Sequence, residues 1–158
     1  MHQDPDKLSG IVDAFGALER EELRNASREL AFKKGVDFNP DVHRECVERA
    51  LDEYVLVELD GLLIAGPTAF PDLPDGGDDL PHILEVSYRD IDRESFYSTI
   101  EQRFRSDAAN AIQTESIPKC RKLIDMSYDL SDWGIKTDTI RDRLVAELER
   151  LEDGRREN

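Results

Sequence analysis

The sequence predicts a mostly helical α+β fold, with a winged-helix-like part near the N-terminus and a helical part after it. Three short N-terminal segments have apolar residues at helical spacing, and the turn dipeptide Asp60-Gly61 separates two apolar runs. Longer amphipathic segments fill the second half of the 158 residues. We divide the chain into a winged-helix-like part at 1–66, a strap at 67–91, a helical part at 92–153 and a frayed tail at 154–158.

Three helices are predicted in the first part. Residues 7–17 have apolar side chains three and four positions apart, which is typical of one buried helix face. Residues 19–34 begin with acidic and end with basic side chains, which suits the two ends of a helix dipole. The third helix, at 40–53, has the clearest start, because Asn39 can cap it and Pro40 suits the first helical position.

A β-hairpin is predicted next. Residues 54–59 are rich in β-branched and aromatic side chains, Asp60-Gly61 suits a type I′ turn, and 62–65 form the return strand. Three helices followed by a hairpin is the order of a winged-helix domain (three helices and a β-hairpin). Another small α+β arrangement is an equally good interpretation, because the order of elements does not fix their topology.

The strap between the two parts has no regular period and is rich in proline and aspartate. We expect Phe70 and Leu73 to be fixed on the core, with a mobile tip near Gly76-Gly77. Residues 83–86 are expected to form a short strand or an extended arm.

The second part is predicted to be helical. One helix spans about 93–114, another begins after Ser116, and a turn region at 128–135 carries the only tryptophan, Trp133. The last helix has an apolar face made by Ile140, Leu144, Leu148 and Leu151. We expect this face, within 138–152, to pack inside the chain, while a homodimer through the same residues is the alternative.

The charge of the chain is its most distinctive property. It has 36 acidic and 21 basic residues, which gives a formal net charge of −15. Because DNA is itself densely negative, this charge argues against general binding to nucleic acids or anionic membranes. An excess of acids with more arginine than lysine is typical of proteins from salt-loving archaea, where molar salt shortens the Debye length to about 3 Å. An ordinary acidic protein is the alternative.

The sequence also indicates the cellular compartment of the protein. No apolar run is long enough to span a bilayer, and residues 1–7 lack the basic and apolar regions of a signal peptide. The two cysteines, Cys46 and Cys120, do not make a disulfide framework. We therefore expect a cytoplasmic protein without membrane contact, with both thiols reduced.

No motif indicates catalysis or cofactor binding. His43 and Cys46 are three residues apart in one predicted helix, but no second pair completes a zinc site, and a buried thiol is the simpler interpretation. The acidic strap lacks the ligand pattern of an EF-hand, and the chain has no Gly-x-Ser-x-Gly or phosphate-binding loop. We therefore predict no catalytic, cofactor or metal site, and no enzyme activity.

Two groups of basic residues are candidate contacts. On the third helix, Arg44 and Arg49 would face DNA, but four acids share their face: Asp41, Glu45, Glu48 and Asp52. A second group could bind an acidic partner or RNA, and it consists of Arg103, Arg105, Lys119, Arg121 and Lys122. Ion pairs along helical surfaces explain this second group more simply.

Four runs of the sequence carry a resemblance to a known family: Ile11–Leu18, Glu29–Gly35, Gly66–Pro74 and Asp79–Leu84. Together they resemble a small-protein family of haloarchaea that has no assigned function, and the similarity extends to residues 128–130. The resemblance implies a halophilic archaeal source and brings no site residues with it.

We therefore predict a non-enzymatic cytoplasmic protein-interaction module of a halophilic archaeon. Its partner is expected to be another protein. The alternative is a winged-helix transcriptional regulator that binds DNA directly through Arg44 and Arg49.

Overall fold

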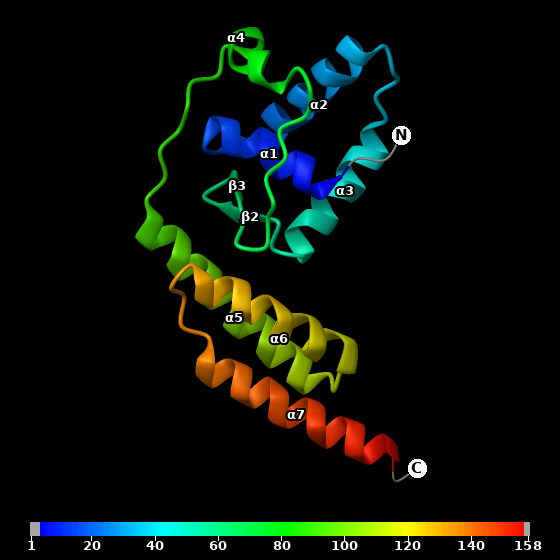
Figure 1. Cartoon of the computed structure of the whole chain (residues 1–158), viewed down its shortest axis with the longest axis vertical. Helices are drawn as coiled ribbons and strands as arrows, with labels where there is room; N and C mark the ends of the chain where they lie inside the picture. Colours follow the sequence, from blue (N-terminus) through cyan, green and yellow to red (C-terminus); the bar gives the residue numbers. More distant parts are fainter. Residues whose placement is uncertain (1–3, 157–158) are drawn as a thin grey trace. The chain divides into compact units, whose positions relative to one another are not determined.

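The computed structural model describes residues 4–156 and divides the chain into two compact units, Met1–Asp92 and Arg93–Asn158 (Figure 1). Helices dominate both, and the described residues hold one small antiparallel sheet of three strands. This confirms the predicted mostly helical α+β fold.

The N-terminal unit contains α1 (Pro5–Phe15), β1 (Leu18–Glu19), α2 (Arg20–Lys34), α3 (Pro40–Asp52), β2 (Leu56–Leu59), β3 (Leu62–Ala65), a 3-10 turn η1 (Gly77–Asp79) and α4 (Leu80–Leu84). The strand order is β1-β3-β2, with both pairings antiparallel. Strand β1 was not predicted. It has two residues, too few to show a period, and it exists because Leu18 and Glu19 pair with Leu63 and Leu62 of β3.

The helix starts follow from local capping. The Asn39 side chain accepts hydrogen bonds from the backbone N–H groups of Asp41 and Val42, which confirms the predicted start of α3. Helix α1 begins at Pro5, two residues earlier than predicted, because the Asp4 side chain caps it.

The hairpin turn also agrees with its prediction. Asp60 and Gly61 have φ angles of 52° and 79°, as a type I′ turn requires. Strand β2 begins at Leu56 instead of residue 54, because Tyr54 has a φ of 62° and lies outside the ladder. A Cβ atom at Gly66 would lie 2.0 Å from the Tyr54 carbonyl oxygen, so only glycine allows this close approach.

The core of the N-terminal unit lies between its helices and the sheet. Its fully buried side chains include Val12, Phe15, Leu18, Leu23, Leu56 and Leu63. Burial of apolar surface on this scale is the main force that holds small α+β units together.

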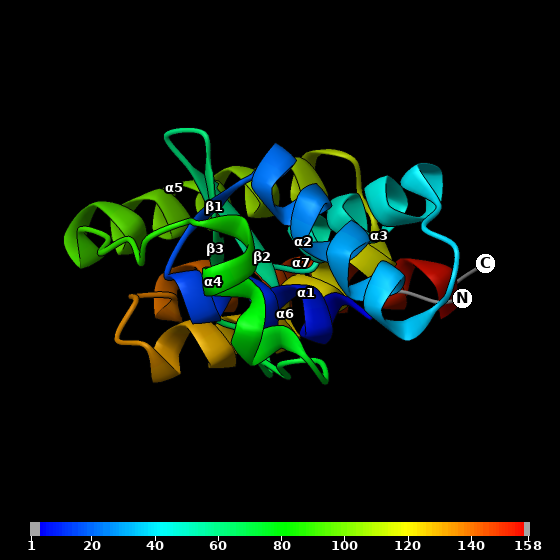
Figure 2. The same ribbon diagram turned by 90° about the horizontal axis from the view of Figure 1, so that it is seen from above.

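The strap docks on α1 through its backbone (Figure 2). The backbone N–H groups of Phe70 and Asp72 donate to the side chain and the carbonyl oxygen of Asp6, at 3.2 and 3.1 Å. The prediction that Phe70 and Leu73 pack into the core is therefore wrong: their side chains are 79% and 41% exposed. The backbone, rather than these side chains, makes the contact, because Gly10 lets it come close to α1.

At the expected mobile tip, Gly77 is buried and begins the 3-10 turn η1, and the mobility of the tip stays a prediction. One further expectation for this region is corrected. Residues 83–84 complete α4, where a strand or extended arm was expected, because Pro81 occupies the first turn of a short helix. After α4, Arg89 forms two hydrogen bonds with the Glu22 carboxylate, at 2.6 and 3.1 Å, and holds this segment against the unit.

The C-terminal unit has three helices, α5 (Arg93–Gln113), α6 (Ile117–Asp132) and α7 (Asp138–Arg156). Its core is formed mainly by Phe96, Ile100, Phe104, Leu123, Leu130 and Leu144. Helix α6 continues to Asp132, through most of the predicted turn region, because Met126 and Leu130 extend its buried face. Trp133 ends the helix and packs against Phe96 at 5.9 Å between ring centroids.

The last helix is longer than predicted. It includes residues 154–156, which were expected to fray, whereas residues 157–158 lie outside the described part of the chain. Between residues 4 and 156, none of the helices combines the length and the apolar character that crossing a membrane requires.

Candidate functional site

The outer face of α3 carries the predicted DNA-contact residues. All six predicted outward side chains are exposed: Asp41, Arg44, Glu45, Glu48, Arg49 and Asp52. The Arg44 guanidinium forms an ion pair with Asp41 at 3.0 Å. One of the two candidate bases is thus already paired with a carboxylate of its own helix, and the face as a whole is acidic.

Two ion pairs of one arginine connect α3 to the hairpin. Arg20, at the start of α2, forms ion pairs with Glu48 of α3 at 2.9 Å and with Glu58 of β2 at 2.8 Å. The two carboxylates raise the pKa of the Arg20 guanidinium, with the hydrogen bond to Glu48 as the largest cause. The Glu48–Arg20–Glu58 group has one base and two acids, so its net charge is negative. Asp60, which is exposed at the hairpin tip, adds a further negative charge.

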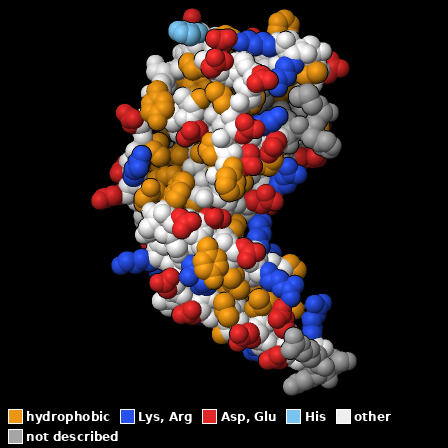
Figure 3. All heavy atoms as spheres, in the orientation of Figure 1, with side chains coloured by type: hydrophobic (Ala, Val, Ile, Leu, Met, Phe, Trp, Pro, Cys, Tyr) orange, Lys and Arg blue, Asp and Glu red, His pale blue; other side chains and the backbone are white. Residues whose placement is uncertain are grey.

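The second basic group lies on α5 and α6, and four of its five side chains have local acidic or polar partners. Figure 3 shows that acidic and basic side chains are intermixed on the visible surface of this unit. Arg103 pairs with Asp107 at 3.6 Å, Arg105 with Glu101 at 3.2 Å, and Arg121 with Glu152 of α7. The Lys119 ammonium donates to the Asn110 side chain at 3.3 Å, and Lys122 is exposed. Because Lys119 contacts α5 whereas Arg121 contacts α7, α6 directs these two bases toward different neighbours.

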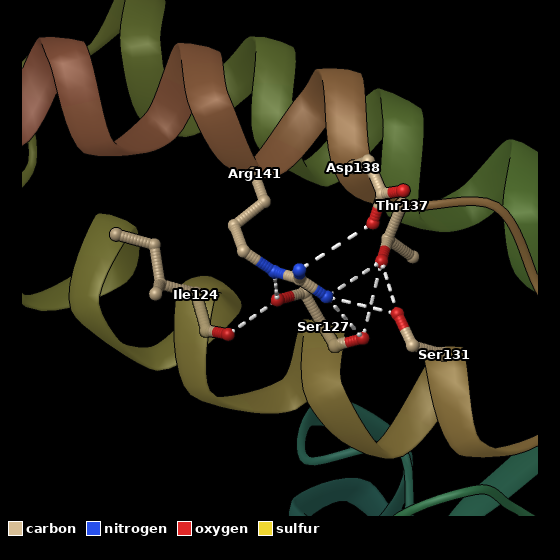
Figure 4. A network of polar contacts seen from close by, with 6 residues as sticks. All are labelled: Ile124, Ser127, Ser131, Thr137, Asp138 and Arg141. Atoms are coloured by element: carbon tan, nitrogen blue, oxygen red, sulfur yellow. Dashed lines mark hydrogen bonds and ion pairs between the residues drawn. The ribbon is translucent and has the colours of Figure 1, made fainter.

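A polar cluster between α6 and α7 was not anticipated (Figure 4). The Arg141 guanidinium donates to the hydroxyls of Ser127, Ser131 and Thr137 at 2.6, 2.8 and 3.0 Å. It also lies 4.1 Å from the centre of the Tyr128 ring. The spacing of four residues from Ser127 to Ser131, and again from Thr137 to Arg141, is the sequence signal that could have revealed it.

This cluster has a structural role, because its hydrogen bonds connect α6 to α7. The Arg141 side chain is only 17% exposed, and its donors already bind protein oxygens, including the Ser127 carbonyl at 3.2 Å. A site for an incoming anion would need free donors. The arrangement instead joins the end of α6 to the start of α7.

The apolar face of α7 packs within the C-terminal unit, on α5 and α6. Leu144 is fully buried. Its neighbours on the same face, Ile140, Leu148 and Leu151, are partly buried. Pairing with a second copy through residues 138–152 stays a prediction.

Most of the exposed large apolar side chains lie in the N-terminal unit. Phe32 on α2 and Phe70 on the strap are each 79% exposed. We call the exposed strap residues Phe70, Pro71 and Leu73 the strap face. Its backbone is fixed on α1, so Phe70 projects from an ordered support.

Burial shifts the pKa values of two titratable side chains in the N-terminal unit. Burial raises the pKa of the Cys46 thiol to about 11, so the thiol is protonated at neutral pH and is a poor nucleophile. Burial, followed by the charge of Arg24, lowers the pKa of His43 to about 4, so this ring is neutral. Residues 4–156 contain no group of three or more His, Cys, Asp or Glu side chains placed to hold a metal ion.

Comparison with known families gives one match. The model of a family of unknown function, DUF7109, matches residues 6–149. The chain belongs to this family. The matched range includes most of both units. The curated proteins and the solved structures gave no match.

Proposed function

We propose that this chain is a non-enzymatic protein-interaction module of the cytoplasm of a salt-adapted archaeon, and that it binds a partner protein through the strap face. The observation that carries the proposal is Phe70, whose side chain is 79% exposed while its backbone is held by Asp6. Energetically dominant interface residues are usually large side chains that a partner can fully desolvate. An ordered backbone reduces the entropy that such a contact loses on binding.

The N-terminal unit is interpreted as winged-helix-like. Its order of elements, α1-β1-α2-α3-β2-β3, and its strand order, β1-β3-β2, support this interpretation. In domains of this kind the third helix enters the major groove of DNA. The acidic outer face of α3 and the Glu48–Arg20–Glu58 bridge would oppose phosphate groups there, which favours a protein partner over DNA.

Adaptation to salt is part of the same proposal. The chain carries 36 acidic residues and a net charge of −15. At molar salt, screening weakens the repulsion among these charges, whereas at low salt it opposes a compact fold. The resemblance to haloarchaeal proteins agrees with this interpretation.

Co-purification from a haloarchaeal host tests the proposal. The tagged chain would be recovered at native salt as the parent, as Phe70→Ala, and as the matched control Phe32→Ala, which removes a phenyl ring of equal exposure. We expect a defined set of proteins to be retained by the parent and the control and lost from Phe70→Ala. Recovery of the same proteins with all three chains would contradict the proposal.

Direct DNA binding is the second candidate, because the order of the helices and strands is compatible with a winged-helix domain. Fluorescence anisotropy with duplex DNA at high salt distinguishes the two. We expect weak, sequence-independent binding that Arg44→Ala and Arg49→Ala hardly change. Tight, sequence-specific binding that is lost in these variants would establish the regulator instead.

A further inference from the structure

Helix α2 carries three arginines in a row. Arg20, Arg24 and Arg28 are exposed and four residues apart, so they follow one side of the helix. Arg20 shows what this row binds, because its guanidinium forms ion pairs with Glu48 and Glu58. Between residues 4 and 156, no carboxylate lies within ion-pair distance of Arg24 or Arg28. We call these two side chains the α2 stripe, and their guanidinium groups are available to carboxylates from outside the chain.

Helix α2 is basic within an acidic unit. It has five basic and three acidic residues, whereas α1 and α3 each have more acids than bases. One acid, Glu21, is exposed on the same side, three residues before Arg24. The Arg28 guanidinium is held over the ring of Phe38, 5.4 Å from its centre. An arginine that is already held in this way loses less freedom when it binds a second group.

The strap presents the opposite charge. Residues 67–82 contain four aspartates and no lysine or arginine. Asp72 and Asp75 are exposed next to the strap face, and neither forms an ion pair with another described residue. The backbone N–H of Asp72 is bound to α1, so these carboxylates and the Phe70 ring project from a fixed segment.

The strap and the α2 stripe also match in length and chemistry. Arg24 and Arg28 are about 6 Å apart along the helix axis. Asp72 and Asp75 are separated by three residues of extended chain, which span at most about 10 Å. Arginine also stacks on aromatic rings, so Arg24 suits the exposed ring of Phe70 as well as a carboxylate.

The strap of one chain cannot reach the α2 stripe of the same chain. It lies along another side of α2, where the Lys33 ammonium is 3.8 Å from the Asp79 carboxylate. A Cβ atom at Gly76 would lie 3.7 Å from the side chains of Leu30 and Lys33. At about 100° per residue, these two side chains are roughly 140–160° around the helix axis from Arg28. Contact between the strap and the α2 stripe therefore requires two copies of the chain.

We propose that the chain self-associates, with Asp72 and Asp75 of one copy bound to Arg24 and Arg28 of another and Phe70 packed against Arg24. This inference rests on the proposed function, because it names a second copy as the partner of the strap face. Aromatic and arginine side chains are the residue types that most often dominate the energy of such contacts.

The acids around the α2 stripe favour a second copy over nucleic acid. Glu21 lies beside Arg24, and Glu48 and Glu58 surround Arg20 at the end of the row. These carboxylates would repel the continuous row of phosphates on a nucleic acid strand. Two separate aspartates on a short segment avoid most of that repulsion.

Sedimentation equilibrium of the full-length chain tests the proposal. The parent would be measured over a range of concentrations, in molar KCl and at the lowest salt at which it is folded. We expect a mean mass that rises above that of the monomer as the concentration increases. Association should weaken as salt rises, because salt screens the attraction between exposed charges. A parent that stays monomeric at every concentration and salt would contradict the proposal.

Two double variants each remove one side of the contact. Arg24→Gln/Arg28→Gln removes the α2 stripe, and Asp72→Asn/Asp75→Asn removes the strap carboxylates. Each should associate at least about tenfold more weakly than the parent. All four side chains are exposed, so both variants should fold.

A mixture of the two variants shows whether the two surfaces bind each other. The first variant keeps an intact strap and the second keeps an intact α2 stripe, so an equimolar mixture should form 1:1 pairs. The matched control Lys34→Gln/Arg49→Gln removes two other exposed bases of the same unit and should associate as the parent does. Variants that stay apart when mixed, or a control that is weakened as much as Arg24→Gln/Arg28→Gln, would overturn the assignment.

Failure of this inference can be distinguished from failure of the proposed function. If the chain is monomeric but Phe70→Ala still loses a different protein in the co-purification, self-association is wrong and the strap face remains a docking surface. If the parent binds duplex DNA tightly and Arg24→Gln/Arg28→Gln does not, the α2 stripe binds phosphates and the inference is wrong.

Discussion

Replacement of Gly10 by alanine should detach the strap from α1. A Cβ atom at this position would lie 2.4 Å from the carbonyl carbon and oxygen of Asp72 and 2.7 Å from the backbone nitrogen of Leu73. These are backbone atoms, so no side chain can rotate away to make room. The strap would have to retreat by about 1 Å to reach ordinary van der Waals contact.

The cost of this change has two parts. Overpacking at a tight contact typically costs about 1–3 kcal/mol. Retreat of the strap also weakens the hydrogen bonds from Phe70 and Asp72 to Asp6, each with a contribution of about 0.5–1.5 kcal/mol. Against this, alanine is favoured over glycine within a helix by about 1 kcal/mol. If both hydrogen bonds are lost, these contributions add up to a decrease of about 1–5 kcal/mol in the free energy of unfolding of Gly10→Ala.

The assay is chemical denaturation followed by circular dichroism at fixed salt, with native-state hydrogen exchange to locate the change. Gly154→Ala in α7 is the matched control, because nothing lies within 4 Å of the added Cβ, and it should be neutral or slightly stabilising. The backbone N–H groups of Phe70 and Asp72 should exchange faster in Gly10→Ala. A variant as stable as the parent, with unchanged exchange at these two amides, would refute the described docking of the strap.

Three further predictions concern the core, a buried histidine and salt. Leu144→Ala should lower the free energy of unfolding by about 2–5 kcal/mol, because Leu144 is fully buried. If light scattering instead shows a dimeric parent and a monomeric variant, and the melting temperature is unchanged, the apolar face of α7 is an interface between two copies of the chain. The pKa of His43 is lowered from 6.5 to about 4, so the unfolded chain takes up a proton that the folded chain does not. The free energy of unfolding should therefore fall by up to about 3 kcal/mol as the pH drops from about 6.5 to 4. This pH-dependent decrease should be absent in His43→Gln. A titration midpoint of His43 far above pH 4, measured by NMR, would contradict the prediction. The melting temperature should be much lower in low salt than in molar KCl, and equal values would contradict adaptation to salt.

Local signals in the sequence were sufficient for several elements. The Asn39-Pro40 pair defines the start of α3, and Asp60-Gly61 defines the hairpin turn, because each depends only on neighbouring backbone geometry. The acidic face of α3 was also predictable, since helical periodicity alone decides which of its side chains are exposed.

Other features depend on contacts between distant residues. Strand β1 exists only because Leu18 pairs with Leu63, and the exposure of Phe70 depends on the approach of the strap backbone to Gly10. The cavity that Leu8, Leu30 and Val42 line could not be predicted either, because these residues come from α1, α2 and α3 and meet only in the folded unit. The sequence therefore indicates helix faces well and the sites between elements poorly.

Site-specific photo-crosslinking in a haloarchaeal host tests the central proposal most directly. A photoreactive amino acid would replace either Phe70 on the strap face or Glu45 on the outer face of α3, both of which are exposed. We predict a discrete, protease-sensitive and nuclease-resistant adduct from position 70 and none from position 45. A nuclease-sensitive adduct from position 45, with no protein adduct from position 70, would show that the chain recognises DNA through α3 and would contradict the proposal.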